Sequence, residues 1–417
     1  MSEVVQLAER ARGAAAAMAG TSTILRNHAL EAMADALLAR QGEILAANER
    51  DMQAAREKST PAPLLDRLAL DPGRIASIAD ALRELVALPD PIGEVTSGLR
   101  LPNGIWLQQI RVPLGVVAMI YEARPNVTAD AAGLCIKTGN AVILRGGSMA
   151  AESNRVMTEV LAEAAEDAGL PADCIQSLTS PAREAAEELM GLHGLIDVLI
   201  PRGGAGLIKS VVENARVPVI ETGVGNCHVY VHETADPDMA LRIVVNAKCQ
   251  RPGVCNAIET ILIDRAIHEA VLPPILKALE ERGVTVYGDE ATRALGVIER
   301  IEPATEDDWA TEYLDLKIAC RVVEGLGEAI SHINTYGTRH SEAIVTEDYS
   351  AATRFLNEVD AAAVYVNAST RFTDGGQFGL GAEIGISTQK LHARGPMGLT
   401  ALTTTKYVAM GSGQIRE

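Results

Sequence analysis

Apolar positions in the first ninety residues recur with a helical period. Residues 3–58 are rich in Ala, Leu, Glu and Arg, and residues 72–88 continue the same pattern. Apolar side chains spaced three and four positions apart form one face of a helix. The pattern therefore predicts a helical N-terminal layer, with charged runs such as Glu49-Arg50-Asp51 on solvated helix faces.

The pattern changes to strand-like residues between positions 91 and 113. Residues 99–101 and 105–110 flank the turn Pro102-Asn103-Gly104. An Asn-Gly pair between two such runs is a strong signal for a β-hairpin. Because a two-stranded ribbon is rarely stable alone, we expect this hairpin to pack on its own domain or on another subunit.

From Leu114 onward, short apolar runs alternate with helical segments. The strand-like runs are 115–120, 141–144, 196–200, 217–220 and 228–231, and the helical runs are 128–138, 149–168, 183–191 and 205–214. Such alternation predicts βαβ units and a mainly parallel, doubly wound sheet. Ligands of such sheets bind beyond the carboxyl ends of the strands.

A second α/β pattern begins after Thr234. Helical spacing covers residues 236–248 and 268–282, strand-like residues cover 258–263 and 284–287, and further elements extend to about residue 366. The acidic segment 302–312 is expected to be irregular, 374–381 is a glycine-rich loop, and the tail 399–408 is strand-like. The chain is thus an α/β protein with two doubly wound domains.

Composition narrows the classes of partner. The 37 basic and 55 acidic residues give a formal charge of −18, and aromatic residues make up only 3%. An acidic protein with few stacking side chains is poorly suited to nucleic acid or to an anionic membrane surface. An anionic substrate or cofactor must then be held by local cations and backbone N–H groups.

The cysteines point to a reducing compartment and to no metal. Six are scattered along the chain, with no CxxC pair and no HExxH pattern. No run of 18 apolar residues occurs, and the N-terminus does not have the pattern of a signal peptide. We expect a cytoplasmic protein with reduced thiols and no membrane span.

Cys255 stands at the most informative position. The helical segment 236–248 is broken by Arg251-Pro252-Gly253, and strand-like residues resume at Ile258. A constrained connection between a helix and a strand often presents a reactive side chain. The alternative for an isolated cysteine is a buried, inert thiol.

Three further features precede it in the chain. Gly203-Gly204 follows a strand and opens a helix, so its N–H groups either approach a phosphate or nicotinamide or form a plain tight turn. Arg145 follows the strand 141–144, where a cation meets a cofactor ribose or lies on the surface. Glu221 stands on a glycine-rich connection as a base, a cofactor contact or a cap.

In this order, these features resemble the aldehyde dehydrogenase superfamily, and most closely its gamma-glutamyl phosphate reductase family. The stretches that carry the resemblance are 112–128, 137–148, 250–256, 323–344 and 372–387. They include Gln250-Arg-Pro-Gly-Val-Cys255-Asn and Phe372-Thr-Asp-Gly-Gly-Gln-Phe378-Gly-Leu-Gly. The resemblance covers essentially the whole chain and favours a reactive Cys255.

The resemblance implies three modules. Residues 1–94, 113–226 and 382–399 would form an NADP-binding domain, and residues 227–381 a catalytic domain. The hairpin 95–112 and the tail 400–417 would form a small β module for oligomerisation. The protein would be a homo-oligomer, a dimer or a tetramer.

It also implies an activity, the NADPH-dependent reduction of L-glutamyl 5-phosphate to L-glutamate 5-semialdehyde with release of phosphate. This reaction is the second step of proline biosynthesis from glutamate. Cys255 would attack the acyl phosphate to form a thioester, which accepts hydride more readily than a carboxylate. The Cys255 backbone N–H and the Asn126 amide are candidates for stabilising the oxyanion.

Other roles follow from position in the family pattern. Glu221 resembles the glutamate that activates water in hydrolytic members, although phosphate is the acyl acceptor here. Glu312 resembles the acid that holds the nicotinamide ribose, although Leu314 replaces the usual Phe. Arg145 would meet the adenosine ribose or its 2′-phosphate, as a cation there suits NADP.

The loops of the family pattern also carry cations for the substrate carboxylate and phosphate, at Arg124, Arg251 and Arg371. Two alternatives stay open. One is a sister Cys-dependent aldehyde dehydrogenase that hydrolyses the thioester or transfers it to CoA. The other is a non-catalytic nucleotide-binding protein with an inert Cys255. Because acyl phosphates hydrolyse readily, docking with the upstream glutamate 5-kinase is a further hypothesis.

Overall fold

The computed structural model describes residues 2–122, 124–180, 182–299 and 301–416. The chain divides into two compact units. The first unit comprises residues 1–222, 379–385 and 397–417, and the second comprises residues 223–378 and 386–396. The units are described separately below.

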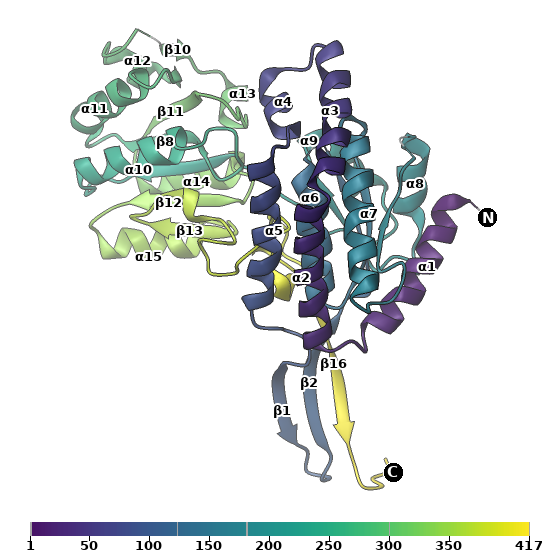
Figure 1. The fold of residues 1–417 in the computed structure, drawn as a ribbon. Helices are drawn as coiled ribbons and strands as arrows, with labels where there is room; N and C mark the ends of the chain where they lie inside the picture. Colours follow the sequence, from purple (N-terminus) through teal and green to yellow (C-terminus); the bar gives the residue numbers. More distant parts are fainter. Residues whose placement is uncertain (1, 123, 181, 300, 417) are drawn as a thin grey trace. The chain divides into compact units, whose positions relative to one another are not determined.

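Five helices open the first unit, as the helical spacing predicts (Figure 1). They are α1 (Glu3–Met18), α2 (Thr23–Ala39), α3 (Gln41–Glu57), α4 (Ala62–Leu68) and α5 (Pro72–Ala87). Local caps fix where they begin, since the side chains of Ser22 and Asp71 accept hydrogen bonds from Leu25 N and Arg74 N. The predicted helical layer is confirmed.

The core of the first unit is a four-stranded parallel sheet in the order β5-β4-β3-β6. Its strands are β3 (Val116–Tyr121), β4 (Ala141–Gly146), β5 (Ile175–Ser177) and β6 (Val198–Arg202). The connecting helices are α6 (Pro125–Lys137), α7 (Ala151–Asp167), α8 (Arg183–Gly191) and α9 (Ala205–Asn214). Every residue of β3 is buried, as expected for a parallel sheet covered by helices.

This sheet differs from the sequence-based expectation in two places. Residues 217–220 form only an isolated bridge between Val219 and Leu199, because Pro218 has no N–H to donate to a ladder. The three-residue strand β5 was not predicted, since it is too short to give a periodic signal.

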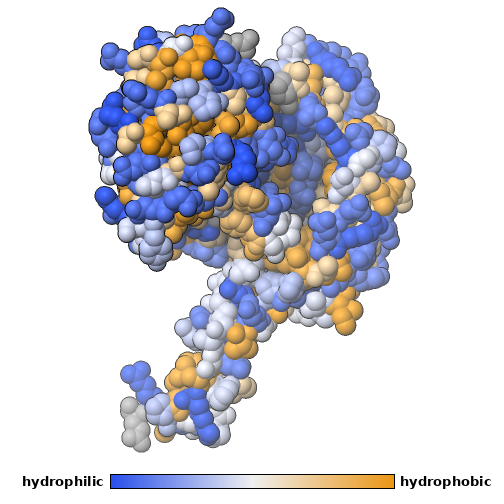
Figure 2. Space-filling view, turned by 90° about the vertical axis from the view of Figure 1, so that its left-hand side faces the viewer, coloured by the Kyte–Doolittle hydropathy of each residue, from blue (hydrophilic) through white to orange (hydrophobic). Residues whose placement is uncertain are grey.

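The predicted hairpin is confirmed and is completed by the tail of the chain. Strands β1 (Val95–Arg100), β2 (Trp106–Pro113) and β16 (Thr403–Met410) pair antiparallel in the order β1-β2-β16. Several large apolar side chains on them are exposed, and Figure 2 shows hydrophobic residues on this sheet. They are Val95, Leu99, Trp106, Tyr407 and Met410.

The second unit is built on a seven-stranded, fully parallel sheet in the order β10-β9-β11-β8-β7-β12-β13. The strands are β7 (Cys227–Val231), β8 (Ile258–Asp264), β9 (Thr285–Gly288), β10 (Ile301–Pro303), β11 (Lys317–Val323), β12 (Ser341–Val345) and β13 (Ala363–Val366). The helices are α10 (Pro237–Cys249), α11 (His268–Glu280), α12 (Glu290–Ala294), α13 (Glu306–Trp309), α14 (Leu326–Tyr336) and α15 (Tyr349–Glu358). Further along the chain, β14 (Ile386–Ser387) and β15 (Gly395–Pro396) form a short antiparallel pair.

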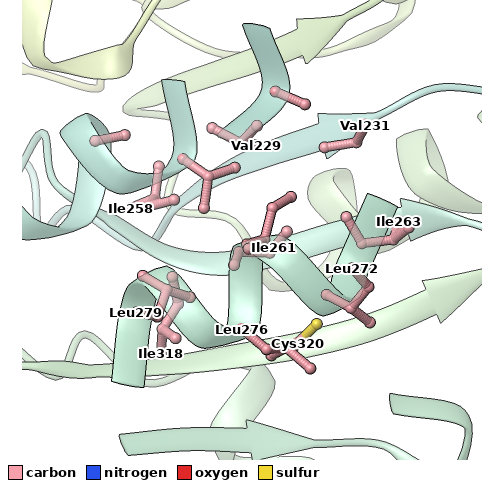
Figure 3. Packing of buried hydrophobic residues seen from close by; sticks show 14 of the residues in the cluster. Val229, Val231, Ile258, Ile261, Ile263, Leu272, Leu276, Leu279, Ile318 and Cys320 are labelled. Atoms are coloured by element: carbon pink, nitrogen blue, oxygen red, sulfur yellow. The ribbon is translucent and has the colours of Figure 1, made fainter. Parts of the chain in front are cut away.

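Apolar side chains from sheet and helices form the core of the second unit. Figure 3 shows Val229, Ile261 and Ile263 of the sheet packed with Leu272 and Leu276 of α11. The segment 302–312 is less irregular than expected, because its start completes β10 and Thr305 caps α13 in a capping box with Asp308. The packed sheet gives a rigid base for the loop that follows α10.

Candidate active site

Cys255 lies in the tight connection between α10 and β8, where the sequence places it. Its thiol is half-buried and not part of a disulfide. The loop is turned by Pro252 and Gly253, and Ala257 N donates to Val254 O at 3.1 Å. The thiol is thus presented from a short, folded connection rather than from a helix or a strand.

Asn256 anchors this loop from inside the unit. Its buried amide donates to Thr373 O at 2.8 Å, and its backbone O accepts from Thr370 Oγ1 at 2.7 Å. Both partners belong to the segment that contains the short helix η2 (Thr370–Phe372). Two hydrogen bonds of this kind hold the residue next to Cys255 on a fixed backbone.

Two guanidinium groups accompany the thiol. Arg371 Nε donates to Gln250 Oε1 at 2.9 Å, which ties the η2 segment to the start of the Cys255 loop. Burial lowers the pKa of Arg371, the neighbouring Arg251 lowers it further, and Asp374 and Cys255 oppose this shift. Arg251 and Cys255 therefore both lie near enough to Arg371 to influence its charge.

The backbone of Gly225 closes the other side of the loop. A Cβ atom on Gly225 would lie 1.6 Å from Cys255 O and 2.6 Å from Cys255 Cα. Cys255 O also accepts a hydrogen bond from Cys227 Sγ at 3.1 Å. Only a glycine permits this approach of the two backbones.

Glu312 meets the same glycine. Its Oε1 accepts from Gly225 N at 2.7 Å, and burial raises its pKa against the effect of that N–H. The second unit therefore brings together four of the residues singled out in the sequence: Arg251, Cys255, Glu312 and Arg371. Gly225 and Asn256 were not singled out, and the only signal for them was a glycine-rich connection and adjacency to the cysteine.

In the first unit, Arg145 lines a cavity of about 570 Å³ near the carboxyl end of β4. Burial lowers the pKa of its guanidinium. The rest of the wall combines apolar side chains with polar ones from α8 and α9. It includes Ile120, Arg183, Glu187, Met190, Leu207, Ser210, Val211 and Asn214.

Gly203 and Gly204 precede α9, as predicted, but a carboxylate already meets them. Glu122 Oε2 accepts from Gly204 N at 3.0 Å, and a Cβ atom on Gly203 would lie 2.7 Å from Glu122 Cδ. The start of α9 therefore does attract negative charge. Glu122 was not foreseen in this place, because 80 residues separate it from the glycines.

The remaining candidates of the first unit lie on loops or at a helix end. Asn126 is exposed in the first turn of α6, and its amide donates to Asp130 Oδ2 at 3.0 Å. Arg124 is the N-cap residue of this helix. Glu221 is half-buried beside Thr222, whose hydroxyl donates to Pro201 O at 2.8 Å.

Within the described ranges, no cluster of three or more His, Cys, Asp or Glu side chains could hold a metal ion. Over the same ranges, no helix is long and apolar enough to cross a membrane.

Comparison with known proteins identifies the family. Residues 1–300 match the Aldehyde dehydrogenase family. The gamma-glutamyl phosphate reductase of Moorella thermoacetica is 62% identical over 100% of this chain and 99% of its own, and that of Thermobifida fusca is 57% identical over 99% of both. The crystal structure of the Thermotoga maritima gamma-glutamyl phosphate reductase is 47% identical, with a TM-score of 0.97 over 100% of both chains.

These matches confirm the family and the α/β fold that the sequence predicts. The chain belongs to the aldehyde dehydrogenase family and, within it, to the gamma-glutamyl phosphate reductases.

Proposed function

We propose that this protein reduces L-glutamyl 5-phosphate to L-glutamate 5-semialdehyde with NADPH and releases inorganic phosphate, the second step of proline biosynthesis from glutamate. The observation that carries the proposal is the Cys255 loop. It presents a half-buried thiol beside Arg251 and Arg371, in a chain 62% identical to a gamma-glutamyl phosphate reductase. A thiol with adjacent cations suits attack on an anionic acyl phosphate.

Cys255 is the nucleophile in this account. Its sulfur forms a bond to the acyl carbon, the carbon–oxygen bond to phosphate breaks, and phosphate leaves with the bonding electron pair. Arg251 and Arg371 balance the charge of the departing phosphate. The Cys255 N–H and the Asn126 amide are the donors proposed for the carbonyl oxygen.

When bound, NADPH supplies the hydride that reduces the thioester carbon. Hydride addition leaves the alkoxide of a thiohemiacetal; its oxygen re-forms the carbonyl as the carbon–sulfur bond breaks, which frees the aldehyde and restores the Cys255 thiolate. No proton has to be gained or lost at the sulfur in this last step. Glu221 needs no role as a base in this direction, because no water attacks the thioester.

The cavity at Arg145 is proposed to hold the adenosine end of the cofactor. Ile120, Leu207 and Val211 offer apolar surface for an adenine ring, and Arg145 and Arg183 offer positive charge for a 2′-phosphate. In the Arg145→Ser variant, the KM for NADPH should rise at least about tenfold, and the KM for NADH should change little. Equal changes for both cofactors would refute the assignment of Arg145 to the 2′-phosphate.

Glu312 is proposed to hold the nicotinamide ribose, and Gly203 and Gly204 to bring backbone N–H groups close to the cofactor. Glu312 accepts a hydrogen bond from Gly225 N, which fixes the orientation of its carboxylate. The Gly204 N–H donates to the Glu122 carboxylate, so a cofactor phosphate at this helix start would have to displace Glu122. Arg124 is proposed to assist in holding the substrate carboxylate.

The three-stranded sheet β1-β2-β16 is proposed as the interface of a homodimer or homotetramer, because it exposes large apolar side chains. We further propose a cytoplasmic enzyme that receives its acyl phosphate from glutamate 5-kinase. If a mixture of kinase and this protein shows neither association nor channelling, docking of the two enzymes is refuted.

Following NADP reduction with glutamate 5-semialdehyde, with and without inorganic phosphate, tests the function. The proposal predicts activity that requires phosphate in the wild type and is lost in Cys255→Ala. Full turnover without phosphate would identify a hydrolytic dehydrogenase and assign a base role to Glu221. Turnover that requires CoA would identify a CoA-acylating enzyme. An active Cys255→Ala variant would refute the assignment of Cys255 as the nucleophile.

A further inference from the structure

A buried ion pair joins the two ends of the Cys255 loop. Lys248 lies in the last turn of α10, and Glu259 is the second residue of β8. Lys248 Nζ and Glu259 Oε2 are 2.5 Å apart, and both side chains are 0% exposed. The pair therefore joins the two ends of the chain segment 249–258, which contains Cys255.

Both charges are costly to bury. Burial lowers the pKa of Lys248, and Glu259 opposes that shift; burial raises the pKa of Glu259 to about 7, and Lys248 opposes it. Two apolar side chains of similar size usually stabilise a core at least as well as a buried ion pair does. The pair thus calls for an explanation other than stability.

The second carboxylate oxygen of Glu259 suggests what the ion pair does. Glu259 Oε1 accepts from Leu314 N at 3.2 Å, and Leu314 has a φ of 52°, which is unfavourable for a residue with a side chain. The strained backbone of Leu314 is two residues from Glu312. One carboxylate therefore contacts both the base of the nucleophile loop and the segment that carries Glu312.

The segment that carries Glu312 is also connected to Cys255, through Gly225. Glu312 accepts from Gly225 N at 2.7 Å, and the Gly225 backbone lies against the Cys255 carbonyl. Lys248, Glu259, the 312–314 segment, Gly225 and Cys255 form a closed frame within one unit.

We propose that Lys248 and Glu259 are positioning residues that fix Cys255 and Glu312 relative to each other. Both side chains are fully buried, and they act through the backbone of the loop and of Leu314. This inference rests on the proposed role of Cys255 as the nucleophile. A purely structural pair would stabilise the fold without setting the reactivity of the thiol.

The test separates these two roles by measuring stability and thiol reactivity in the same variants. Lys248→Met and Glu259→Gln each break the pair, and the double variant Lys248→Met/Glu259→Gln leaves no unpaired buried charge and keeps an acceptor for Leu314 N. The rate of Cys255 alkylation by iodoacetamide, followed on the Cys255 peptide by mass spectrometry, reports the thiol without any substrate. The midpoint of urea unfolding and kcat complete the set.

We expect the double variant to recover most of the wild-type stability while its alkylation rate stays about tenfold or more below wild type and its kcat about a hundredfold below. Recovery of alkylation and kcat together with stability would overturn the proposal. If the double variant does not fold, Glu259→Asp decides. It keeps the charge but is too short to reach both Lys248 and Leu314 N, so wild-type reactivity in that folded variant would also overturn the proposal.

Asp90→Asn is the matched control, because it removes the charge that pairs with the buried Arg26 in the first unit. It should lower stability and leave alkylation of Cys255 unchanged. The alkylation rate does not depend on which substrate the enzyme uses. A wrong assignment of the reaction would therefore appear in the phosphate assay and not in this one.

Discussion

Replacing Gly225 by alanine should disable the enzyme by displacing the Cys255 loop. The new Cβ atom would lie 1.6 Å from Cys255 O. To reach an ordinary contact the two backbones must separate by roughly 2 Å. The clash is with backbone atoms of Cys255 and not with the flexible end of a side chain, so the backbone itself has to move.

Two consequences follow for measurement. Misplacing a reacting group by about 1 Å costs on the order of a hundredfold in rate, or about 2.7 kcal/mol in the activation free energy, so kcat of Gly225→Ala should fall at least that far. Overpacking should also lower the free energy of unfolding by about 1–3 kcal/mol. The assay is NADP reduction with glutamate 5-semialdehyde and phosphate, with urea unfolding in parallel.

Gly42→Ala is the control. Gly42 lies in the first turn of α3, and a Cβ atom there would meet nothing within 4 Å. Removing a helical glycine should raise the free energy of unfolding by about 0.4–1 kcal/mol and leave kcat unchanged. If Gly225→Ala retains wild-type kcat and stability, the close approach of Gly225 to Cys255 is not a feature of the protein in solution.

Three further predictions concern the loop anchor, acid stability and assembly. Asn256→Leu leaves Thr373 O without its donor, so urea unfolding should show a loss of about 1–3 kcal/mol; no loss would mean that the anchor contributes nothing. Burial, with the nearby charges of His228 and Arg321, lowers the pKa of His332 from 6.5 to about 3. As the pH falls, His332 is therefore protonated in the unfolded chain before it is protonated in the folded protein. The free energy of unfolding should decrease as the pH drops from 6.5 toward 3. The decrease in Tm over pH 6.5 to 4 should be smaller in His332→Asn, and an equal decrease would contradict this cause. Trp106→Glu places a charge on the exposed apolar sheet and should shift the proposed oligomer to smaller species in sedimentation velocity, whereas unchanged assembly would exclude this interface.

Local signals were sufficient to predict the structural setting of Cys255. Pro252 and Gly253 end α10, and β-branched residues restart a strand at Ile258, so the Cys255 connection could be read from the sequence alone. The Asn-Gly turn predicted the hairpin in the same way. In each case the elements that decide the structure lie within a few residues of one another.

The contacts that shape the site depend on residues far apart in the chain. Thr373 lies 117 positions from Asn256, and Glu312 lies 87 positions from Gly225. Single-sequence patterns do not encode such pairings, because period and turn chemistry report only neighbours along the chain. A local pattern can also mislead. The apolar residues around Pro218 suggested a strand, but Pro218 has no N–H to donate to a ladder.

The most direct test of the central claim is to detect the acyl group on Cys255. The protein is mixed with glutamate 5-semialdehyde and NADP without phosphate, quenched in acid, and the Cys255 peptide is analysed by mass spectrometry. A reaction through Cys255 should give a burst of one NADPH per chain and a glutamyl thioester on Cys255 that disappears when phosphate is added. Steady turnover with an unmodified Cys255 peptide would contradict a reaction through this cysteine.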